Sequence, residues 1–279
     1  MKLGEIELHI IQDGSFGLDG GAMFGIVPRP LWSRTKVPDT ANRIRLSLNC
    51  VLVRTADRTI LVEAGLGRSL PPGFGEHLAC EEVGRLEERL AELDVGAADV
   101  DVLILSHLHF DHAGGATWLA EDGRWHPTFP NAEVWVQRGE WENACRPNER
   151  TRAAYRPESL RPLEAEGRVR FLDGPVRVAP GVRLEVLGGH TPHMMGVWVE
   201  AAGATVFFAS DLVPTTAHLR YPYIAAYDLD PLTTLETKQR LLPVAAREGW
   251  WWIFAHDERP MARLEEDEKG HIRPCEEAR

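Results

Sequence analysis

The amino-acid sequence predicts an α/β fold. Short apolar runs typical of buried strands alternate with polar segments along the 279 residues. Residues 81–93 carry apolar side chains at spacings of three and four, which indicates an amphipathic helix. Several predicted strands are followed directly by a histidine or an aspartate. Because open α/β sheets hold ligands at the carboxyl edge of their strands, this pattern predicts one functional site at a sheet edge.

The elements follow in order from the alternation and the turn residues. Strands are expected where apolar residues alternate or cluster, over residues 5–13, 45–54, 59–63, 103–105, 133–136, 169–171, 182–187, 197–200, 205–209 and 251–255. Helices are expected over residues 81–93 and 137–145, and from an Asp230 cap with Pro231 in the first turn, with a kink at Pro243. Residues 146–166 are predicted to be a solvated helical excursion, because charges of both signs are mixed there.

The stretch over residues 103–115 holds the densest set of potential metal ligands. A buried strand is followed by four such side chains within six positions: His107, His109, Asp111 and His112. On extended backbone the first three would point the same way, with the fourth joining them as the chain turns. Neutral imidazoles and carboxylates suit zinc, iron or manganese, and without a cation they would repel one another when buried. A solvated histidine-rich loop is the alternative.

Three later strands also end in a potential ligand. His190 follows the strand at 182–187, Asp211 follows the strand at 205–209, and His256 follows the strand at 251–255. A single histidine at a strand end is usually structural. Repetition of the same arrangement predicts that these side chains belong to a common site.

Taken in order, these segments resemble the two-metal form of the metallo-β-lactamase fold superfamily. The matching residues are His107-x-His109-x-Asp111-His112, Gly189-His190-Thr191-Pro192, Asp211 and His256, within residues 40–260. The resemblance implies a four-layer αββα sandwich of two mixed sheets flanked by helices. It also implies that His107, His109 and His190 hold the first ion. Asp111, His112 and His256 would hold the second, with Asp211 bridging both.

The same resemblance implies hydrolysis without a protein nucleophile. Two divalent ions would lower the pKa of a shared water and polarise the substrate. Asp111 is the candidate to pass a proton to the leaving group. Zinc is the expected metal, although iron, manganese and mixed pairs accept the same ligands.

The spacing of the motifs resembles both N-acyl homoserine lactonases and methyl parathion hydrolase-like proteins. We therefore expect a lactonase of the quorum-quenching type, acting on a small-molecule ester or lactone with an apolar tail. The alternatives are a phosphotriesterase or arylesterase, and then a glyoxalase II-like thioesterase. A metal-binding protein without hydrolytic activity is a fourth possibility, which the full ligand set disfavours.

Some positions depart from the family's pattern. Pro214 stands where lactonases commonly have a tyrosine, and Tyr223 is the preferred substitute, with Tyr221 and His218 as alternatives. His193 stands in an altered HTPGH-like segment and is expected to line the substrate pocket or to support a ligand. Glu63 replaces the usual aspartate that orients a ligand histidine, so that supporting contact is in doubt.

Residues 14–40 are predicted to form a long glycine-rich loop. Met23, Phe24 and Trp32 are its bulky apolar side chains. They are candidates to line the substrate pocket, with Met23 and Phe24 preferred, or to contact a second subunit. Alternatively, they anchor the loop to its own core.

Composition limits the class of protein. At 44% hydrophobic residues the chain can bury a large core, and a single domain over residues 1–279 is expected, with a polar tail at 260–279 that is a surface helix or frayed. A net charge of -11 opposes nucleic acid and anionic membranes as partners. Four scattered cysteines and the lack of an apolar leader favour the cytoplasm. A homodimer is expected because dimers are usual among the relatives.

Overall fold

The computed structural model describes residues 1–275, which form two compact units. Unit 1 consists of Met1–Phe16 and Leu48–Pro180, and unit 2 consists of Gly17–Ser47 and the described chain from Gly181 onward. Each unit has its own apolar core. A single domain over residues 1–279 stays a prediction.

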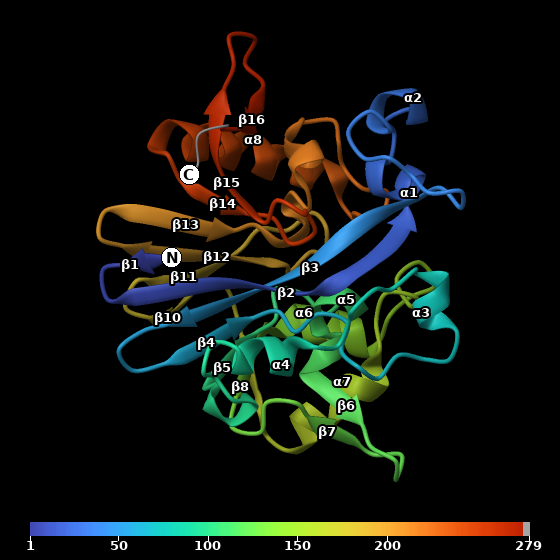
Figure 1. Cartoon of the computed structure of the whole chain (residues 1–279), viewed down its shortest axis with the longest axis vertical. Coiled ribbons are helices and arrows are strands. Elements are labelled where there is room, and N and C mark those ends of the chain that lie inside the picture. Colours follow the sequence, from blue (N-terminus) through green and yellow to red (C-terminus); the bar gives the residue numbers. More distant parts are fainter. Residues whose placement is uncertain (276–279) are drawn as a thin grey trace. The chain divides into compact units, whose positions relative to one another are not determined.

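The described residues form two seven-stranded sheets and one two-stranded sheet (Figure 1). The first large sheet has the order β1-β2-β3-β4-β5-β8-β9: β1 Lys2–Leu3, β2 Ile6–Asp19, β3 Arg43–Arg54, β4 Thr59–Val62, β5 Val102–Ile104, β8 Glu133–Gln137 and β9 Val169–Leu172. It is mixed, because β1–β2 and β3–β4 are antiparallel whereas β4, β5, β8 and β9 pair in parallel. The small sheet pairs β6 Thr117–Leu119 with β7 Trp125–Pro127.

The second large sheet follows chain order from β10 to β16. Its strands are β10 Val176–Ala179, β11 Val182–Val186, β12 Met195–Ala201, β13 Ala204–Phe208, β14 Trp251–Ile253, β15 Met261–Glu266 and β16 Ile272–Pro274. The β13–β14 pair is parallel, and the pairs β11–β12, β12–β13, β14–β15 and β15–β16 are antiparallel.

Eight α-helices lie within residues 1–275: α1 Gly20–Phe24, α2 Arg29–Trp32, α3 Phe74–His77, α4 Leu86–Ala91, α5 Phe110–Ala113, α6 Arg138–Cys145, α7 Pro157–Ala165 and α8 Pro231–Glu248. Short 3-10 turns are η1 Ala97–Asp99, η2 Gly114–Ala116, η3 Ser210–Leu212 and η4 Thr216–Leu219. Two mixed sheets with helices confirm the predicted α/β fold class. The described chain contains no helix with the length and apolarity that crossing a bilayer requires.

The core of unit 1 joins one face of the first sheet to its helices. Strand residues such as Leu61 and Leu103 share an apolar cluster with Leu90 of α4, Trp141 of α6 and Leu160 of α7. The region 146–166 was predicted to be solvated, and that expectation is only half right. Helix α7 forms there, but its Leu160 is buried in this core because the helix is amphipathic.

The core of unit 2 is built from aromatic strand residues and helix α8. Trp198, Phe207 and Trp252 of the sheet lie in one apolar cluster with Leu241 and Leu242 of the helix. Helix α8 contacts β15, and Figure 1 shows the two side by side. The predicted cap is confirmed, since the Asp230 side chain accepts a hydrogen bond from the Thr233 amide. The helix continues through Pro243.

Strand β2 is longer than predicted, because it continues to Asp19 through residues assigned to the long loop. Ser15 exchanges two backbone hydrogen bonds with Glu81. Gly14 has a φ of +88°, and a Cβ there would lie 2.4 Å from the Glu81 carbonyl oxygen. The glycine therefore serves a close backbone approach, where sequence alone suggested a flexible loop.

The prediction of a helix over residues 81–93 is also wrong about where the helix begins. Helix α4 begins at Leu86, since Gly84 has a φ of +77°, which no right-handed helix permits. The buried Asp13 carboxylate accepts hydrogen bonds from the amides of Gly84 and Arg85. Burial raises the pKa of Asp13 to about 7. This distant carboxylate caps the helix in place of a local residue.

The bulky residues of the N-terminal segment anchor it to unit 2. Phe24 is fully buried and stacks on Trp32, with ring centroids 5.3 Å apart, and on His218 at 4.7 Å. Met23 is buried as well. Of the alternatives considered above, packing against the segment's own core is therefore the one that these contacts support.

The polar tail expected over residues 260–279 is wrong for its described part. Residues 261–274 contain the antiparallel pair β15 and β16, and residues 276–279 lie outside the described chain. Ala262, Leu264 and Ile272 are buried between charged neighbours. The charged residues hid this two-residue alternation in the sequence.

Candidate metal centre

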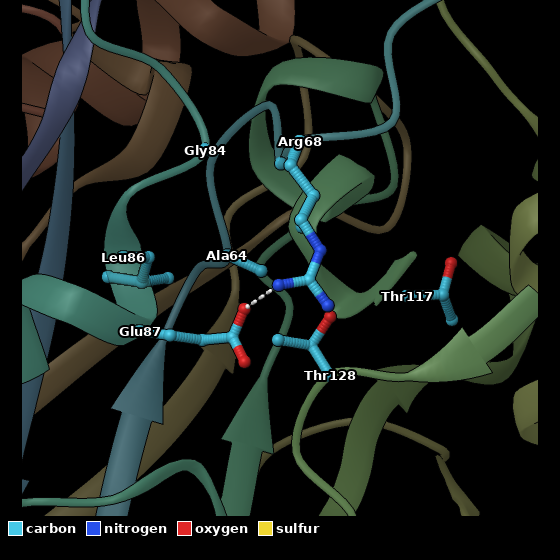
Figure 2. Close-up of a pocket in the computed structure, with 9 residues that line it drawn as sticks. Ala64, Arg68, Gly84, Leu86, Glu87, Thr117 and Thr128 are labelled. Carbon is cyan, nitrogen blue, oxygen red and sulfur yellow. Dashed lines mark hydrogen bonds and ion pairs between the residues drawn. The ribbon is translucent and has the colours of Figure 1, made fainter. Parts of the chain in front are cut away.

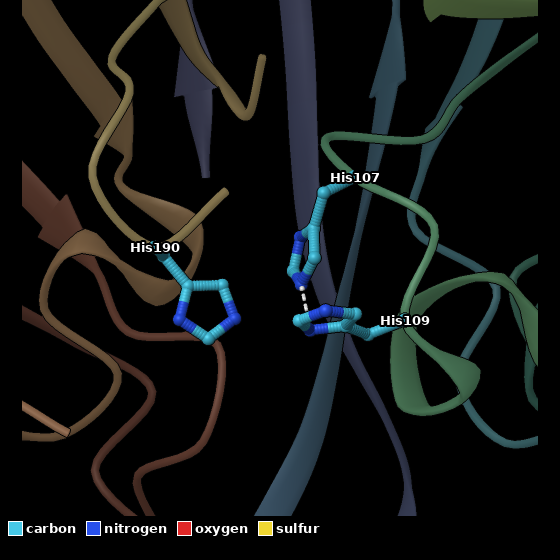
Figure 3. Close-up of side chains that lie close together, drawn as sticks. All are labelled: His107, His109 and His190. Atoms are coloured by element: carbon cyan, nitrogen blue, oxygen red, sulfur yellow. Dashed lines mark hydrogen bonds between the residues drawn. The ribbon is translucent and has the colours of Figure 1, made fainter. Parts of the chain in front are cut away.

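In unit 1 the motif residues follow β5 and gather at the start of α5. His107, His109, Asp111 and His112 are all buried. Nε2 of His107 lies 3.1 Å from Nδ1 of His109 (Figure 3), and the rings of His107 and His112 have centroids 4.1 Å apart. The prediction of extended backbone as far as Asp111 is wrong, because α5 begins at Phe110. The turn comes earlier because the backbones of Gly114 and Gly115 pack directly on residues 64–67.

Glu63 supports this group of histidines. Its Oε1 lies 3.4 Å from Nδ1 of His112, and its Oε2 accepts from the Ser106 amide at 3.4 Å. Suitable ligand atoms of Glu63, His107 and His112 all lie within 4.8 Å of one another. Asp111 Oδ2 lies 3.7 Å from His112 Nε2. Glu63 thus reaches the partner that the usual, shorter aspartate would contact.

A second buried carboxylate in unit 1 was missed by sequence reasoning. Oε1 of Glu140, on α6, accepts from the Leu108 amide at 3.1 Å and from the Tyr155 hydroxyl at 3.0 Å. Burial and the nearby Glu140 charge raise the pKa of Tyr155, so the phenol stays a donor. The Tyr155 ring lies 4.9 Å from the His109 ring. Glu140 therefore fixes the backbone between two motif histidines.

In unit 2, two histidines face the same carboxylate. Nε2 of His190, which Figure 3 also draws, lies 3.2 Å from Oδ2 of Asp211. Nε2 of His256 lies 3.1 Å from Oδ1 of the same Asp211. Both histidines are buried. The loops after β11, β13 and β14 thus bring together three residues that the sequence singled out.

The other ring nitrogen of each histidine is held by an acceptor. Nδ1 of His256 donates to the Ser47 carbonyl oxygen at 2.8 Å, and Nδ1 of His190 contacts Oδ1 of Asp228 at 2.8 Å. Asp228 also accepts from the Thr234 hydroxyl of α8 at 2.6 Å. No motif distinguishes Ser47 or Asp228 in the sequence, because a backbone carbonyl and a loop aspartate 38 residues away leave no local signal.

These contacts make the site suitable for a cation. A carbonyl oxygen only accepts, so Nδ1 of His256 carries the proton, and a neutral ring then presents a lone pair on Nε2. That lone pair faces the carboxylate of Asp211 at 3.1 Å. Two electron-rich atoms at this distance repel unless a proton or metal ion lies beside them. Fixing of a ligand histidine by a hydrogen bond at its other nitrogen is typical of metal sites.

The substrate candidates of unit 2 lie around helix α8. Tyr223 is buried and packs edge-to-face on Phe24, at 5.7 Å between centroids. Nζ of Lys238, on α8, donates to the carbonyls of Arg220 at 2.8 Å, Tyr223 at 2.9 Å and Tyr221 at 3.4 Å. Burial lowers the pKa of Lys238 to about 7, and both its ammonium and its amine form can donate. The backbone around Tyr223 is thereby fixed.

The contacts of His218 show what its side chain does, whereas those of His193 do not. His218, an alternative to Tyr223, is fully buried, with Nε2 donating to the Met23 carbonyl at 2.8 Å and Nδ1 2.8 Å from the Thr215 hydroxyl. Both nitrogens are therefore used structurally. His193 is half-buried, and its role stays a prediction.

The neutral side chain of His218 should contribute stability that is lost in mild acid. Burial lowers its pKa from 6.5 to about 4, so between these values the unfolded chain binds a proton that the folded chain excludes. The neutral His218 side chain therefore makes its full contribution to stability above pH 6.5, and this contribution is lost as the pH falls toward 4. We expect His218 to contribute a loss of about 2 kcal/mol from pH 7.5 to pH 5. Urea unfolding of the wild type and His218→Gln at both pH values measures it.

The exposed His271 offers a control for this measurement. His271→Gln should keep the pH dependence of the wild type, whereas the shift from pH 7.5 to pH 5 should cost His218→Gln about 2 kcal/mol less stability than it costs the wild type. An equal slope in the wild type and His218→Gln would contradict the assignment.

A small pocket in unit 1 is not part of the histidine cluster. It is lined by Ala64, Gly67, Arg68, Gly84, Leu86, Glu87, Gly115, Thr117 and Thr128 (Figure 2). Arg68 Nη1 donates to Glu87 at 2.9 Å, and the guanidinium carbon lies 4.5 Å from the centre of the Trp118 ring. None of the predicted metal ligands lines it.

Comparisons with known proteins agree with this chemistry. The profile of the metallo-beta-lactamase superfamily matches residues 43–256. An N-acyl homoserine lactonase of Bacillus thuringiensis is 28% identical over 225 residues, covering 77% of this chain and 82% of the relative. A crystal structure described as a probable metal-dependent hydrolase from Staphylococcus aureus is 29% identical, with a TM-score of 0.90 and full coverage of both chains.

A further solved structure is an N-acyl homoserine lactone hydrolase with the product N-hexanoyl-L-homoserine bound at its catalytic metal center. It is 25% identical, with a TM-score of 0.71, and the match covers 93% of this chain and 95% of that chain. The superfamily match spans the whole run of motif residues from Glu63 to His256. The chain therefore belongs to the metallo-beta-lactamase superfamily and is a metal-dependent hydrolase.

Proposed function

We propose that this protein is a lactonase that opens N-acyl homoserine lactones or closely related esters with the help of two divalent ions. The observation that carries the metal site is the pair of histidines in unit 2, His190 and His256, facing one carboxylate of Asp211. The choice of lactone as substrate is supported by the N-acyl homoserine lactonases of Bacillus among the relatives.

The proposed ligand set is the one that the resemblance to two-metal relatives implies. One ion would be held by His107, His109 and His190, the other by Asp111, His112 and His256, with Asp211 shared. When bound, the ions would supply activated water at neutral pH and polarise the ester carbonyl. We propose zinc for both positions, because imidazole and carboxylate ligands suit it.

The chain's own residues would position these ligands and move the proton. Asp228 and the Ser47 carbonyl hold the Nδ1 protons of His190 and His256, so that each Nε2 stays available. The Glu63 carboxylate lies 3.4 Å from Nδ1 of His112 and would orient that ring. Asp111 would give a proton to the leaving alkoxide, and Tyr223 would contact the substrate carbonyl.

Metal analysis with a panel of substrates tests the proposal. Purified protein should hold two divalent ions per chain and hydrolyse N-acyl homoserine lactones with a higher kcat/KM than the other substrates of the panel: paraoxon, p-nitrophenyl acetate, S-lactoylglutathione and nitrocefin. Preference for paraoxon would favour the phosphotriesterase alternative. Turnover of nitrocefin alone, or protein that stays metal-free at saturating zinc, would overturn the proposed lactonase function.

We further propose a cytoplasmic homodimer. The four cysteines lie within the described chain as free thiols, which is typical of a reducing compartment. Sedimentation of the metal-loaded protein at several concentrations tests the dimer.

A further inference from the structure

Arg156 lies beside the histidine cluster of unit 1, just before α7. Its guanidinium carbon is 4.5 Å from the centre of the Phe74 ring and 5.6 Å from that of Phe110. Two aromatic faces thus hold the guanidinium in place. Such contacts favour a cation but do not satisfy its N–H donors.

The guanidinium has a donor without an acceptor. Nη2 of Arg156 is buried and makes no hydrogen bond, and no carboxylate within residues 1–275 forms an ion pair with this side chain. Other arginines that lie over rings in unit 1 are paired: Arg68 with Glu87, and Arg138 with Asp173. A buried donor left unsatisfied is costly, and an acceptor bound at this position would remove the cost.

The position of Arg156 points to the substrate as that acceptor. The Phe110 amide donates to the Ala154 carbonyl at 2.8 Å, and the Tyr155 ring lies 4.9 Å from the ring of His109. Residues 154–156 therefore lie directly against the turn that carries His109 and Asp111. The carboxylates of Glu158 and, less strongly, Asp111 are close enough to act electrostatically on the guanidinium.

We propose that Arg156 donates a hydrogen bond to the amide carbonyl oxygen of an N-acyl lactone and so determines specificity for acylated substrates. This inference rests on the proposed lactonase function. Phe74 and Phe110 place apolar surface on the guanidinium, which suits a group that joins a polar carbonyl to an alkyl chain. A substrate without the amide would gain nothing from Arg156.

Two lactones distinguish a contact between Arg156 and the substrate amide from an effect of Arg156 on every substrate. For Arg156→Met, kcat/KM for N-hexanoyl-L-homoserine lactone should fall roughly 10- to 100-fold, mainly through KM, the range for a hydrogen bond to a charged group. For γ-butyrolactone, which lacks the amide, it should change by less than about twofold. Arg156→Lys should recover part of the loss. Equal losses for both lactones, or none, would overturn the inference.

The control is Arg68→Met, which removes another ring-stacked arginine of unit 1 and should leave both lactones unaffected. Thermal unfolding and metal content show whether each variant folds and binds its ions. If Arg156→Met does not fold, Arg156→Lys and Arg156→Gln take its place in the same comparison, since both keep a donor and most of the side chain.

A binding measurement judges the inference separately from the lactonase proposal. The probe is the ring-opened N-hexanoyl-L-homoserine, titrated calorimetrically into the metal-loaded wild type and Arg156→Met. Weaker binding to the variant by about tenfold or more supports the inference even if the wild type opens no lactone, in which case only the proposed function fails. Equal binding to both proteins, or no binding to either, overturns the inference.

Discussion

Asp211→Asn is expected to lower kcat/KM for lactones, the proposed substrates, by about 1000-fold and to reduce the two ions of the proposed site to one or none. The substitution keeps the shape of the side chain and removes its negative charge. In unit 2 this carboxylate faces the Nε2 atoms of both His190 and His256, so the loss falls on every ion that those histidines hold. A 1000-fold loss in kcat/KM corresponds to several kcal/mol of lost charge stabilisation in the transition state.

Variants of two further aspartates serve as comparisons for the Asp211→Asn measurement. Asp228→Asn keeps an oxygen that accepts from His190 and should cost only about 10- to 100-fold, as expected for a group that orients a ligand. Asp122→Asn changes an exposed turn between β6 and β7 and should have no effect. Steady-state kinetics and elemental analysis measure all three. Unchanged metal content and activity in Asp211→Asn would contradict the bridging role.

Lys238→Met is expected to destabilise the protein by about 3 kcal/mol and to lower the proposed lactonase activity at least tenfold. Methionine fills a similar volume but leaves the carbonyls of residues 220, 221 and 223 without their donor. Each lost hydrogen bond costs about 1 kcal/mol. Removal of the amine's own desolvation cost offsets only part of this. Because these carbonyls belong to the segment that carries Tyr223, activity should suffer with stability.

Arg240→Met on the same helix provides the control, since Arg240 is exposed. Its free energy of unfolding should stay within about 0.5 kcal/mol of the wild type. Urea unfolding should show a larger Lys238→Met defect at pH 8.5 than at pH 6, because above pH 7 the folded wild type has lost a proton that its unfolded chain still binds, which raises its stability with pH. A variant as stable and active as the wild type would show that Lys238 has no positioning role.

The candidate ligand residues are visible in the sequence, whereas the groups that hold them in place are not. His107, His109, His190, Asp211 and His256 stand at strand ends or in a dense motif, so their types and spacing are visible in the letters. Their partners Glu140, Asp228 and the Ser47 carbonyl are ordinary residues that only folding brings near. Contacts between distant residues leave no local pattern, so they were not predicted.

The fold class and most strands could be predicted, whereas several boundaries could not. Apolar alternation placed β3, β4, β5, β8, β9 and β11 to β14, because burial dominates there, whereas it did not mark the short strands β6, β7 and β10. Residues 14–19 looked like a loop because glycine is common in loops, yet Gly14 is needed for a close backbone approach. Helix α4 starts late because Gly84 has a positive φ, and the Asp13 carboxylate, 72 positions before Arg85, holds the Arg85 amide just before the helix.

The division into two units has a consequence for synthesis on the ribosome. Unit 2 combines Gly17–Ser47 with the C-terminal part of the chain, and the ring of His218 binds the Met23 carbonyl across 195 positions. The early segment therefore emerges long before the residues that bury Phe24 and Trp32 exist. A nascent chain must keep these aromatic side chains exposed until residues 218–223 have been synthesised, and a product truncated before them exposes the side chains permanently to chaperones and proteases.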